Sequence, residues 1–218
     1  MTVNVTKLGI ALLLCLALAG CTRVIDTPLP KAQPPAAPIT VGQVSDLLSE
    51  QAQPDDDPNL FVTVEPEECA GLVREVDPPF LFDTTPAAHD GGQHFAEDGE
   101  LSVSVVEMVA VYPASFDPKA AVDEAKRTIE SCRNDTMFVT AMEGQELYFR
   151  LLPPSDSGSP DMVLWSVESG GWACDNAYVA AHNAAIELTT CGEVNGYDVR
   201  SLAEAALERI EKLANMSL

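Results

Sequence analysis

The sequence predicts an α+β fold with a meandering, mostly antiparallel sheet, helices packed on one face of the sheet, and two disulfides. Several segments rich in β-branched and aromatic residues follow one another with turn-forming residues between them, which is typical of antiparallel strands. Two segments, 117–132 and 198–214, have apolar residues at the three- and four-residue steps of a helix. Adjacent strands framed by helices indicate α+β rather than alternating α/β.

The chain begins with an export signal over residues 1–20. Lys7 precedes an apolar run from Leu8 to Leu18, which is too short for a membrane span. The residues Leu18-Ala19-Gly20-Cys21 resemble the lipobox of bacterial lipoproteins, in which the cysteine carries acyl chains such as palmitate. We therefore expect lipidation at Cys21 and a lipid-anchored domain on the extracytoplasmic face of the cell membrane. Ordinary secretion is the alternative.

A tether and one domain are expected after the signal. Residues 21–39 are rich in Pro and Ala, which favours an extended linker over a packed segment. The remaining residues, 40–218, are enough for one domain with one core, and the sequence contains no repeat or second boundary.

The charge of the chain excludes some partners. It has 12 Lys and Arg against 34 Asp and Glu, for a net charge of −22. Binding to nucleic acids or to anionic lipid surfaces requires clusters of basic residues, so no nucleic acid is expected as a partner. The lipid on Cys21 alone must then attach the protein to the membrane.

Helical signals come first in the domain. Thr40 can cap a helix whose apolar stripe lies within 41–48, and Pro66 starts a helical turn that points Cys69 inward. Segment 77–100 looks irregular. A strand is expected over 101–113, and Asp117-Pro118 starts the helix that ends at Cys132. Further strands are expected over 136–142, 146–152 and 162–168, and Asp198 can cap the last helix.

Segment 174–191 predicts a hairpin closed by a disulfide. If His182 and Asn183 form a two-residue turn, the numbers of facing residues add up to 365, as do those of Cys174 and Cys191. Of the three possible pairings of the four exported cysteines, this arithmetic favours Cys174–Cys191, which leaves Cys69–Cys132 by exclusion.

The two faces of this hairpin differ in polarity. Val179 with Ile186 are apolar, whereas Tyr178 opposite Glu187 predicts an exposed face. A zinc site at the cysteines is disfavoured because the chain has no CxxC pair, and structural disulfides are commoner than redox switches outside the cytoplasm.

The order of the cysteine motifs resembles the extracytoplasmic sensor domains of the mycobacterial PknH type. The matching features are Pro66-Glu67-Glu68-Cys69-Ala70, the strand Val109–Pro113 before the helix to Cys132, and Trp172-Ala173-Cys174 through Cys191. In that family the domain is fused to a receptor Ser/Thr kinase or occurs alone as a lipoprotein, and this chain is similar to the second kind. The resemblance implies a two-disulfide α+β domain with a broad cleft for an unidentified envelope ligand.

Metal binding and catalysis have weak candidates. The segment His89–His94 could offer two imidazoles to a metal, and Asp55–Asp57 could attract calcium, but each is better explained as a solvated loop. His89, His94 and His182 are the histidines of the chain, and no motif of a catalytic nucleophile accompanies them. We expect no enzyme, no metal and no cofactor.

Two functions from different classes remain. The first is a sensor or binding module that takes an envelope-derived small molecule into a cleft, and the second is a module that docks another envelope protein. A lipid carrier is disfavoured because the strand patterns alternate. The cleft-lining residues are unknown at this point, although five aromatic residues in predicted strands can reach a cleft or the core: Tyr112, Tyr148, Phe149, Trp165 and Trp172.

Overall fold

Eight antiparallel strands form one sheet in the order β1-β4-β5-β6-β7-β8-β3-β2. The computed structural model describes residues 38–54, 59–98 and 101–216, so the predicted export signal, Cys21, most of the predicted tether and Asp55–Asp57 lie outside the described residues. The strands are β1 (Phe61–Glu65), β2 (Ala88–Asp98), β3 (Leu101–Val111), β4 (Thr136–Ala141), β5 (Glu146–Leu151), β6 (Met162–Ser169), β7 (Trp172–Ala181) and β8 (Ala184–Gly192). The helices are η1 (Val41–Leu47), η2 (Glu67–Leu72), α2 (Pro79–Phe82), α3 (Pro118–Ser131) and α4 (Val199–Met216).

The predicted helix starts are confirmed by their caps. Asp117 Oδ1 accepts a hydrogen bond from Ala120 N at 3.0 Å, and Asp198 Oδ1 accepts one from Ser201 N at 3.2 Å. The two predicted elements nearer the N-terminus, η1 and η2, are 3₁₀-helices. Among the described helices, none has the length and hydropathy that a membrane span requires.

The hairpin β7–β8 has the predicted register. Cys174 faces Cys191 and is bonded to it, and Cys69 is bonded to Cys132. His182 takes the positive φ of the turn, at 53°, although asparagine was the better candidate for it. The Asn183 side chain is instead buried.

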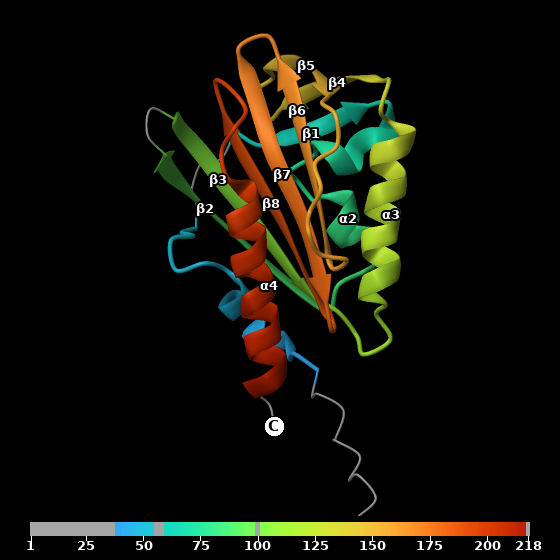
Figure 1. The fold of residues 1–218 in the computed structure, drawn as a ribbon, viewed down its shortest axis with the longest axis vertical. Coiled ribbons are helices and arrows are strands. Elements are labelled where there is room, and N and C mark those ends of the chain that lie inside the picture. The colour runs from blue at the N-terminus through green and yellow to red at the C-terminus, as the bar shows by residue number, and fades with distance from the viewer. Residues whose placement is uncertain (1–37, 55–58, 99–100, 217–218) are drawn as a thin grey trace, which may run out of the picture. The chain divides into compact units, whose positions relative to one another are not determined.

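The α+β class, the antiparallel sheet and the two disulfides are confirmed, but the helices lie on both faces of the sheet and not on one. Tyr178 and Ala180 of β7 pack in one hydrophobic cluster with α3, whereas Val179 and Ala181 pack in a second cluster with α4. Accordingly α3 and α4 run on opposite sides of β7 (Figure 1). Because β7 and β8 are buried on both faces, the expected exposure of Tyr178 and Glu187 is wrong.

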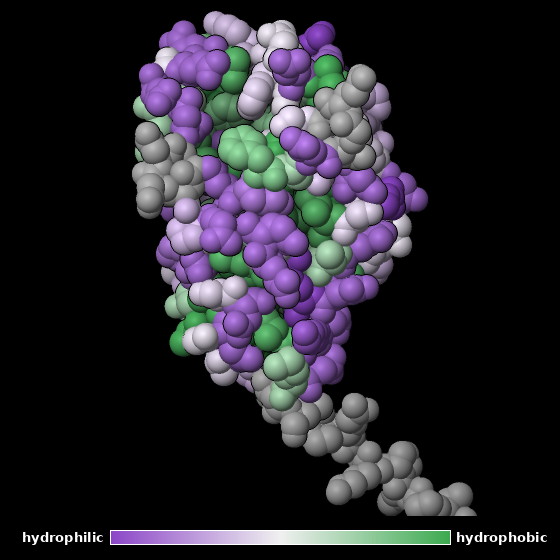
Figure 2. Space-filling view, turned by 90° about the vertical axis from the view of Figure 1, so that its left-hand side faces the viewer, coloured by the Kyte–Doolittle hydropathy of each residue, from purple (hydrophilic) through white to green (hydrophobic). Residues whose placement is uncertain are grey.

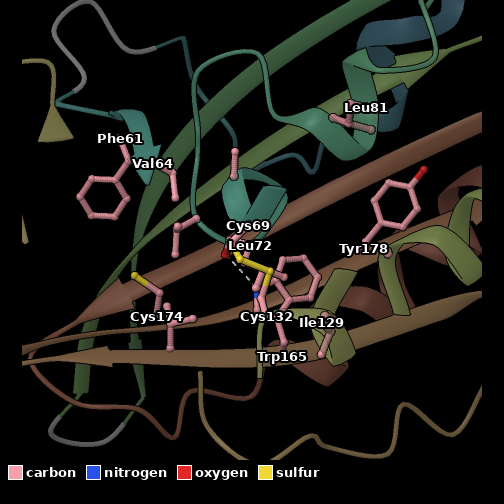
Figure 3. Packing of buried hydrophobic residues seen from close by; sticks show 14 of the residues in the cluster. Phe61, Val64, Cys69, Leu72, Leu81, Ile129, Cys132, Trp165, Cys174 and Tyr178 are labelled. Carbon is pink, nitrogen blue, oxygen red and sulfur yellow. Dashed lines mark hydrogen bonds between the residues drawn. A yellow bond between two sulfur atoms is a disulfide. The ribbon is translucent and has the colours of Figure 1, made fainter. Parts of the chain in front are cut away.

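The cluster on the α3 side is held by a hydrogen bond and a disulfide. The indole N–H of Trp165 donates to Leu72 O at 2.8 Å, and the Cys69–Cys132 bond joins η2 to the end of α3 (Figure 3). The aromatic ring of Phe80, from α2, meets the Trp165 ring edge-on at 5.7 Å.

Segment 77–100 is ordered, which corrects the prediction of an irregular stretch. It contains α2 and the edge strand β2, which pairs with β3 along its whole length. Gly92 fits because a Cβ there would lie 3.0 Å from Ala52 Cβ and 3.2 Å from Gln53 O, where residue 53 bridges to Gln93 on the free edge of β2. Glycine in this strand therefore reflects close approach of a neighbouring segment and not a flexible loop.

Candidate functional site

Both edges of the sheet contribute to one cleft. Phe61 at the start of β1 and Gln93 of β2 line the same hollow of about 470 Å³, although β1 and β2 stand at opposite ends of the strand order. The sheet must therefore curl so that its two edges approach each other. Between them lie Trp172 of β7 and Cys191 of β8, so the Cys174–Cys191 disulfide adjoins the cleft.

The cleft has an aromatic and amide lining with one carboxyl group. Trp172 is half-buried, and its indole N–H has no hydrogen-bond partner among the described residues. Phe95 is 78% exposed. The full lining consists of Asn59, Leu60, Phe61, Glu75, Gln93, Phe95, Ser104, Val106, Gln145, Trp172 and Cys191.

Glu75 is the ionisable group of the cleft. Its Oε2 accepts a hydrogen bond from Phe61 N at 2.8 Å, while Glu75 N donates to Phe61 O at 2.9 Å. Both the side chain and the backbone of Glu75 therefore bind the first residue of β1. Burial raises the pKa of Glu75 to about 7, and the hydrogen bond from Phe61 opposes this rise. Near neutral pH this carboxyl group can therefore change protonation state.

A second buried carboxyl group interacts with Glu75. Burial raises the pKa of Glu187 well above its ordinary value, the charge of Glu75 raises it further, and Arg74 opposes both. Glu187 Oε2 and the hydroxyl of its cross-strand neighbour Tyr178 have no hydrogen-bond partner among the described residues. Buried polar atoms without a hydrogen-bond partner are rare in native proteins, and a water molecule or a ligand can supply the missing partner.

A second hollow of the described residues lies elsewhere and is less suitable. It measures about 530 Å³ and lies between α3 and the loop 152–161. Most of its lining side chains are exposed, among them Lys126, Glu130 and Asp156. Ligand sites are more often concave and apolar with a few placed polar groups, which describes the cleft better.

The predicted metal and catalytic candidates are not brought together. His89 and His94 are five residues apart on β2, so they point to opposite faces of the sheet. His89 packs against Phe82, and His182 at the hairpin turn lies 3.1 Å from a carboxylate oxygen of Glu211. A cluster of Cys69, Cys132 and Asp135 has the spacing of metal ligands, but its sulfurs form a disulfide.

The aromatic candidates divide between core and cleft. Trp165, Phe149 and Tyr112 are buried in the core, Tyr148 is exposed, and Trp172 lines the cleft. Sequence reasoning missed Glu75, Gln93 and Gln145, because isolated polar residues carry no periodic signal and meet only when the sheet curls.

The comparisons with known proteins agree with this fold. Residues 29–209 match the family of PknH-like extracellular domains. Two proteins named as lipoprotein LprH, from Mycobacterium tuberculosis and Mycobacterium bovis, are each 25% identical over 161 residues, which is 71% of this chain and 64% of the relative. The chain thus spans less than two thirds of those relatives.

The crystal structure of the extracellular domain of PknH from Mycobacterium tuberculosis is similar to this chain. Its TM-score is 0.65 at 20% identity, over 81% of this chain and 99% of that one. At this identity the likeness concerns the fold.

Proposed function

This chain belongs to the family of PknH-like extracellular domains, and from that premise we propose that it is a lipid-anchored, non-catalytic sensor or binding domain. It acts on the extracytoplasmic side of the membrane and takes a small, envelope-derived ligand into the cleft between the edges of its sheet. The name of the LprH relatives supports the lipid anchor, for which Cys21 is the acylated residue.

The observation that carries this proposal is the composition of the cleft. A half-buried tryptophan with an unpaired N–H, beside a buried carboxyl group of raised pKa, is an arrangement that proteins build at ligand sites. Structural stability alone does not require it, since an apolar residue at position 75 would avoid the cost of burying a carboxyl group.

The proposal of no catalysis rests on the hydroxyl groups and histidines. Ser49 is bonded to Glu107 through both its N–H and its hydroxyl group, so its hydroxyl donates to a carboxylate and not to a histidine. A serine nucleophile that a histidine activates as general base would need its hydroxyl group to donate to that histidine.

Docking of an envelope protein is the second candidate. It is favoured by Phe95, which is exposed on the edge strand β2. The face on this side carries several small hydrophobic groups among hydrophilic residues (Figure 2). Protein interfaces usually have a larger contiguous apolar core, so the small-ligand function has better support.

The test uses the exported chain, residues 22–218, purified with its disulfides intact. It is mixed with a total envelope extract, desalted and examined by native mass spectrometry. We expect a discrete small-molecule adduct that Trp172→Ala removes and Tyr148→Ala, an exposed aromatic residue outside the cleft, retains. Failure to find an adduct, while crosslinking in intact cells captures a specific protein through Phe95, would replace the sensor function by the docking function.

A further inference from the structure

We propose that the ligand of the cleft is an uncharged glycan segment, which packs on Trp172 and is hydrogen bonded by the amide side chains of Gln93 and Gln145. This inference rests on the proposed function, because it names the chemical class that the same cleft selects. Three features of the lining carry it: charge, aromatic surface and amide content.

The charge of the lining excludes anionic ligands. Among the described residues that line the cleft there is no Lys, Arg or His, and their one ionisable group is Glu75. The whole chain has a net charge of −22. A phosphate or carboxylate entering the cleft would meet no counter-charge and would lose its hydration, so binding would be unfavourable. The basic side chains Lys126 and Arg133 line a different hollow, between α3 and the loop 152–161.

The aromatic residues supply surface for sugar rings. Trp172 is half-buried in the wall, and Phe95 stands 78% exposed at the β2 edge. Flat aromatic faces pack well against the C–H faces of sugar rings. The Trp172 N–H is buried behind this surface and has no partner among the described residues, so the surface that Trp172 offers a ligand is that of its ring.

The amide side chains match hydroxyl groups. Gln93 and Gln145 each offer an acceptor oxygen and two donor hydrogens, and Ser104 adds a hydroxyl. A sugar hydroxyl both donates and accepts, so adjacent hydroxyls can satisfy an amide fully. Glu75 contributes an acceptor when it is ionised.

An acyl chain would be a poorer ligand for the same lining. It would cover the amides of Gln93 and Gln145 without pairing them, and each unpaired buried polar group opposes binding. The cleft is also open to solvent along the amide side, since Asn59 and Gln145 are both exposed. Lipid sites are typically more enclosed and more uniformly apolar.

The test compares four probes with the exported chain. Maltohexaose and fully N-acetylated chitotetraose are neutral, a hexameric oligogalacturonate is anionic, and phosphatidylcholine vesicles present acyl chains. Binding is followed by tryptophan fluorescence and native mass spectrometry. The neutral fraction of an envelope polysaccharide hydrolysate, separated from the acidic fraction by anion exchange, is then examined in the same way.

We expect only the neutral oligosaccharides to bind to the exported chain, and the neutral envelope fraction to bind most tightly. Trp172→Ala and Gln93→Ala should each weaken it by about tenfold. Gln145→Ala changes an exposed side chain, so it keeps the test valid if Trp172→Ala fails to fold. Tyr148→Ala should bind as the natural chain does.

Other outcomes separate this inference from the proposed function. Binding of the acidic fraction or of the vesicles, lost in the cleft variants, would overturn the glycan class and leave a ligand-binding cleft. Neutral glycan binding that survives all three cleft substitutions would overturn the assignment to this cleft. If no probe, no fraction and no extract component binds, both proposals fall.

Discussion

At the scale of single residues, the buried carboxyl groups Glu75 and Glu187 are the least expected feature. Both have a raised pKa because burial disfavours the charged form, and the charge of Glu75 raises the pKa of Glu187 further. Glu75 lines the cleft, whereas Glu187 lies on the same face of the sheet next to Tyr178. Protonation of this pair therefore couples the cleft to the stability of the fold.

We predict that the domain loses stability as the pH rises from about 4.5 to about 7. The folded Glu75 has a pKa of about 7 against an ordinary 4.5, so in this window the folded state keeps a proton that the unfolded state releases. Stability from this group is therefore fully present below the unfolded pKa and lost as the pH passes the folded one. The loss for Glu75 alone is about 3 kcal/mol above pH 8, an order-of-magnitude figure.

Urea unfolding at pH 5 and pH 8 measures this effect. Glu75→Gln keeps an acceptor for Phe61 N–H and should make the free energy of unfolding less dependent on pH. The variant should therefore gain more stability over the natural chain at pH 8 than at pH 5. Glu204→Gln, at an exposed position on α4, serves as the control and should leave the slope unchanged. An unchanged slope in Glu75→Gln would contradict the prediction.

The hairpin turn shows what residue preferences can and cannot predict. Asn183 was the natural candidate for positive φ, but His182 takes it, because the Asn183 side chain is used elsewhere. Its amide donates to Ile39 O and Tyr112 O, both at 2.9 Å, and accepts from Ile39 N at 2.8 Å. These partners lie far away in the sequence, so local propensity could not reveal them.

At the scale of elements, periodicity predicted most strands and both long helices. The register of β7–β8 followed from the turn position alone, because pairing in a hairpin is fixed by its turn. The strand β1 and the strand β2 were missed. Both are edge strands, and β2 contains two glycines, which oppose strand formation locally.

The faces of the hairpin were harder to predict than its register. Tyr178 and Glu187 carry polar atoms and indicated a solvent face, yet η2, α2 and α3 cover it. An alternation of polar and apolar residues predicts which face is exposed only where no other element of the fold packs over the polar residues. The error therefore falls on the side of the sheet that carries the candidate site, where such exceptions are expected.

The two disulfides should differ in their effect on stability. Cys69–Cys132 joins residues 63 apart in sequence, whereas Cys174–Cys191 joins residues 17 apart. In the chain-entropy account, loss of the first costs about 4 kcal/mol and loss of the second about 3 kcal/mol. We predict that Cys69→Ala with Cys132→Ala destabilises the domain more, as measured by urea unfolding. The reverse order would show that strain or residual structure outweighs loop length.

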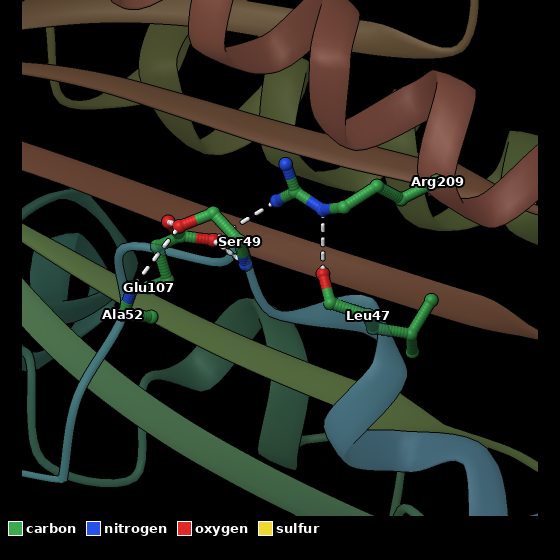
Figure 4. Close-up of polar contacts among 5 residues, drawn as sticks. All are labelled: Leu47, Ser49, Ala52, Glu107 and Arg209. Atoms are coloured by element: carbon green, nitrogen blue, oxygen red, sulfur yellow. Dashed lines mark hydrogen bonds and ion pairs between the residues drawn. The ribbon is translucent and has the colours of Figure 1, made fainter.

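The ion pair Glu107–Arg209 ties α4 to β3. Arg209 Nη2 donates to Glu107 Oε2 at 2.9 Å, and its Nε donates to Leu47 O at 2.8 Å (Figure 4). Ser49 donates to the same carboxylate through both its N–H and its hydroxyl group. The Glu107 side chain is only 2% exposed, so these donors take the place of water around its carboxylate group.

We predict that Arg209→Met costs about 3–5 kcal/mol, because it leaves a buried charge without its cation. Glu107→Gln combined with Arg209→Met should cost clearly less than the sum of the single changes. The surface pair Arg150–Glu168 is the control, since the Arg150 side chain is 71% exposed, and Arg150→Met should cost less than about 1 kcal/mol. Additive effects in the first pair would mean that the contact is energetically unimportant.

At the scale of the whole domain, the beginning of the described chain and the cleft lie at opposite ends of one hairpin. Ile39, where the described chain begins to pack, is hydrogen bonded to Asn183 at the β7–β8 turn. Trp172 and Cys191 lie at the other end of β7 and β8. The strand β7 has 10 residues, so about 30 Å separates the two ends. The beginning of the described chain and the end of α4 lie together in Figure 1.

We predict that a domain held through the tether presents its cleft away from the membrane.

The test attaches the exported chain to maleimide-bearing vesicles that contain brominated phosphatidylcholine, through Pro38→Cys or, as the control, through Glu143→Cys. Residue 143 lies in the β4–β5 turn next to Gln145 of the cleft. Brominated lipid quenches tryptophan only at short range, so the Trp172 contribution should be quenched in the Glu143→Cys form and not in the Pro38→Cys form. Trp172→Phe identifies that contribution, because the other tryptophan, Trp165, is buried in the core. Equal quenching in the two forms would mean that the attached domain lies down on the membrane, and the cleft would then be placed to meet membrane components rather than molecules of the space beyond.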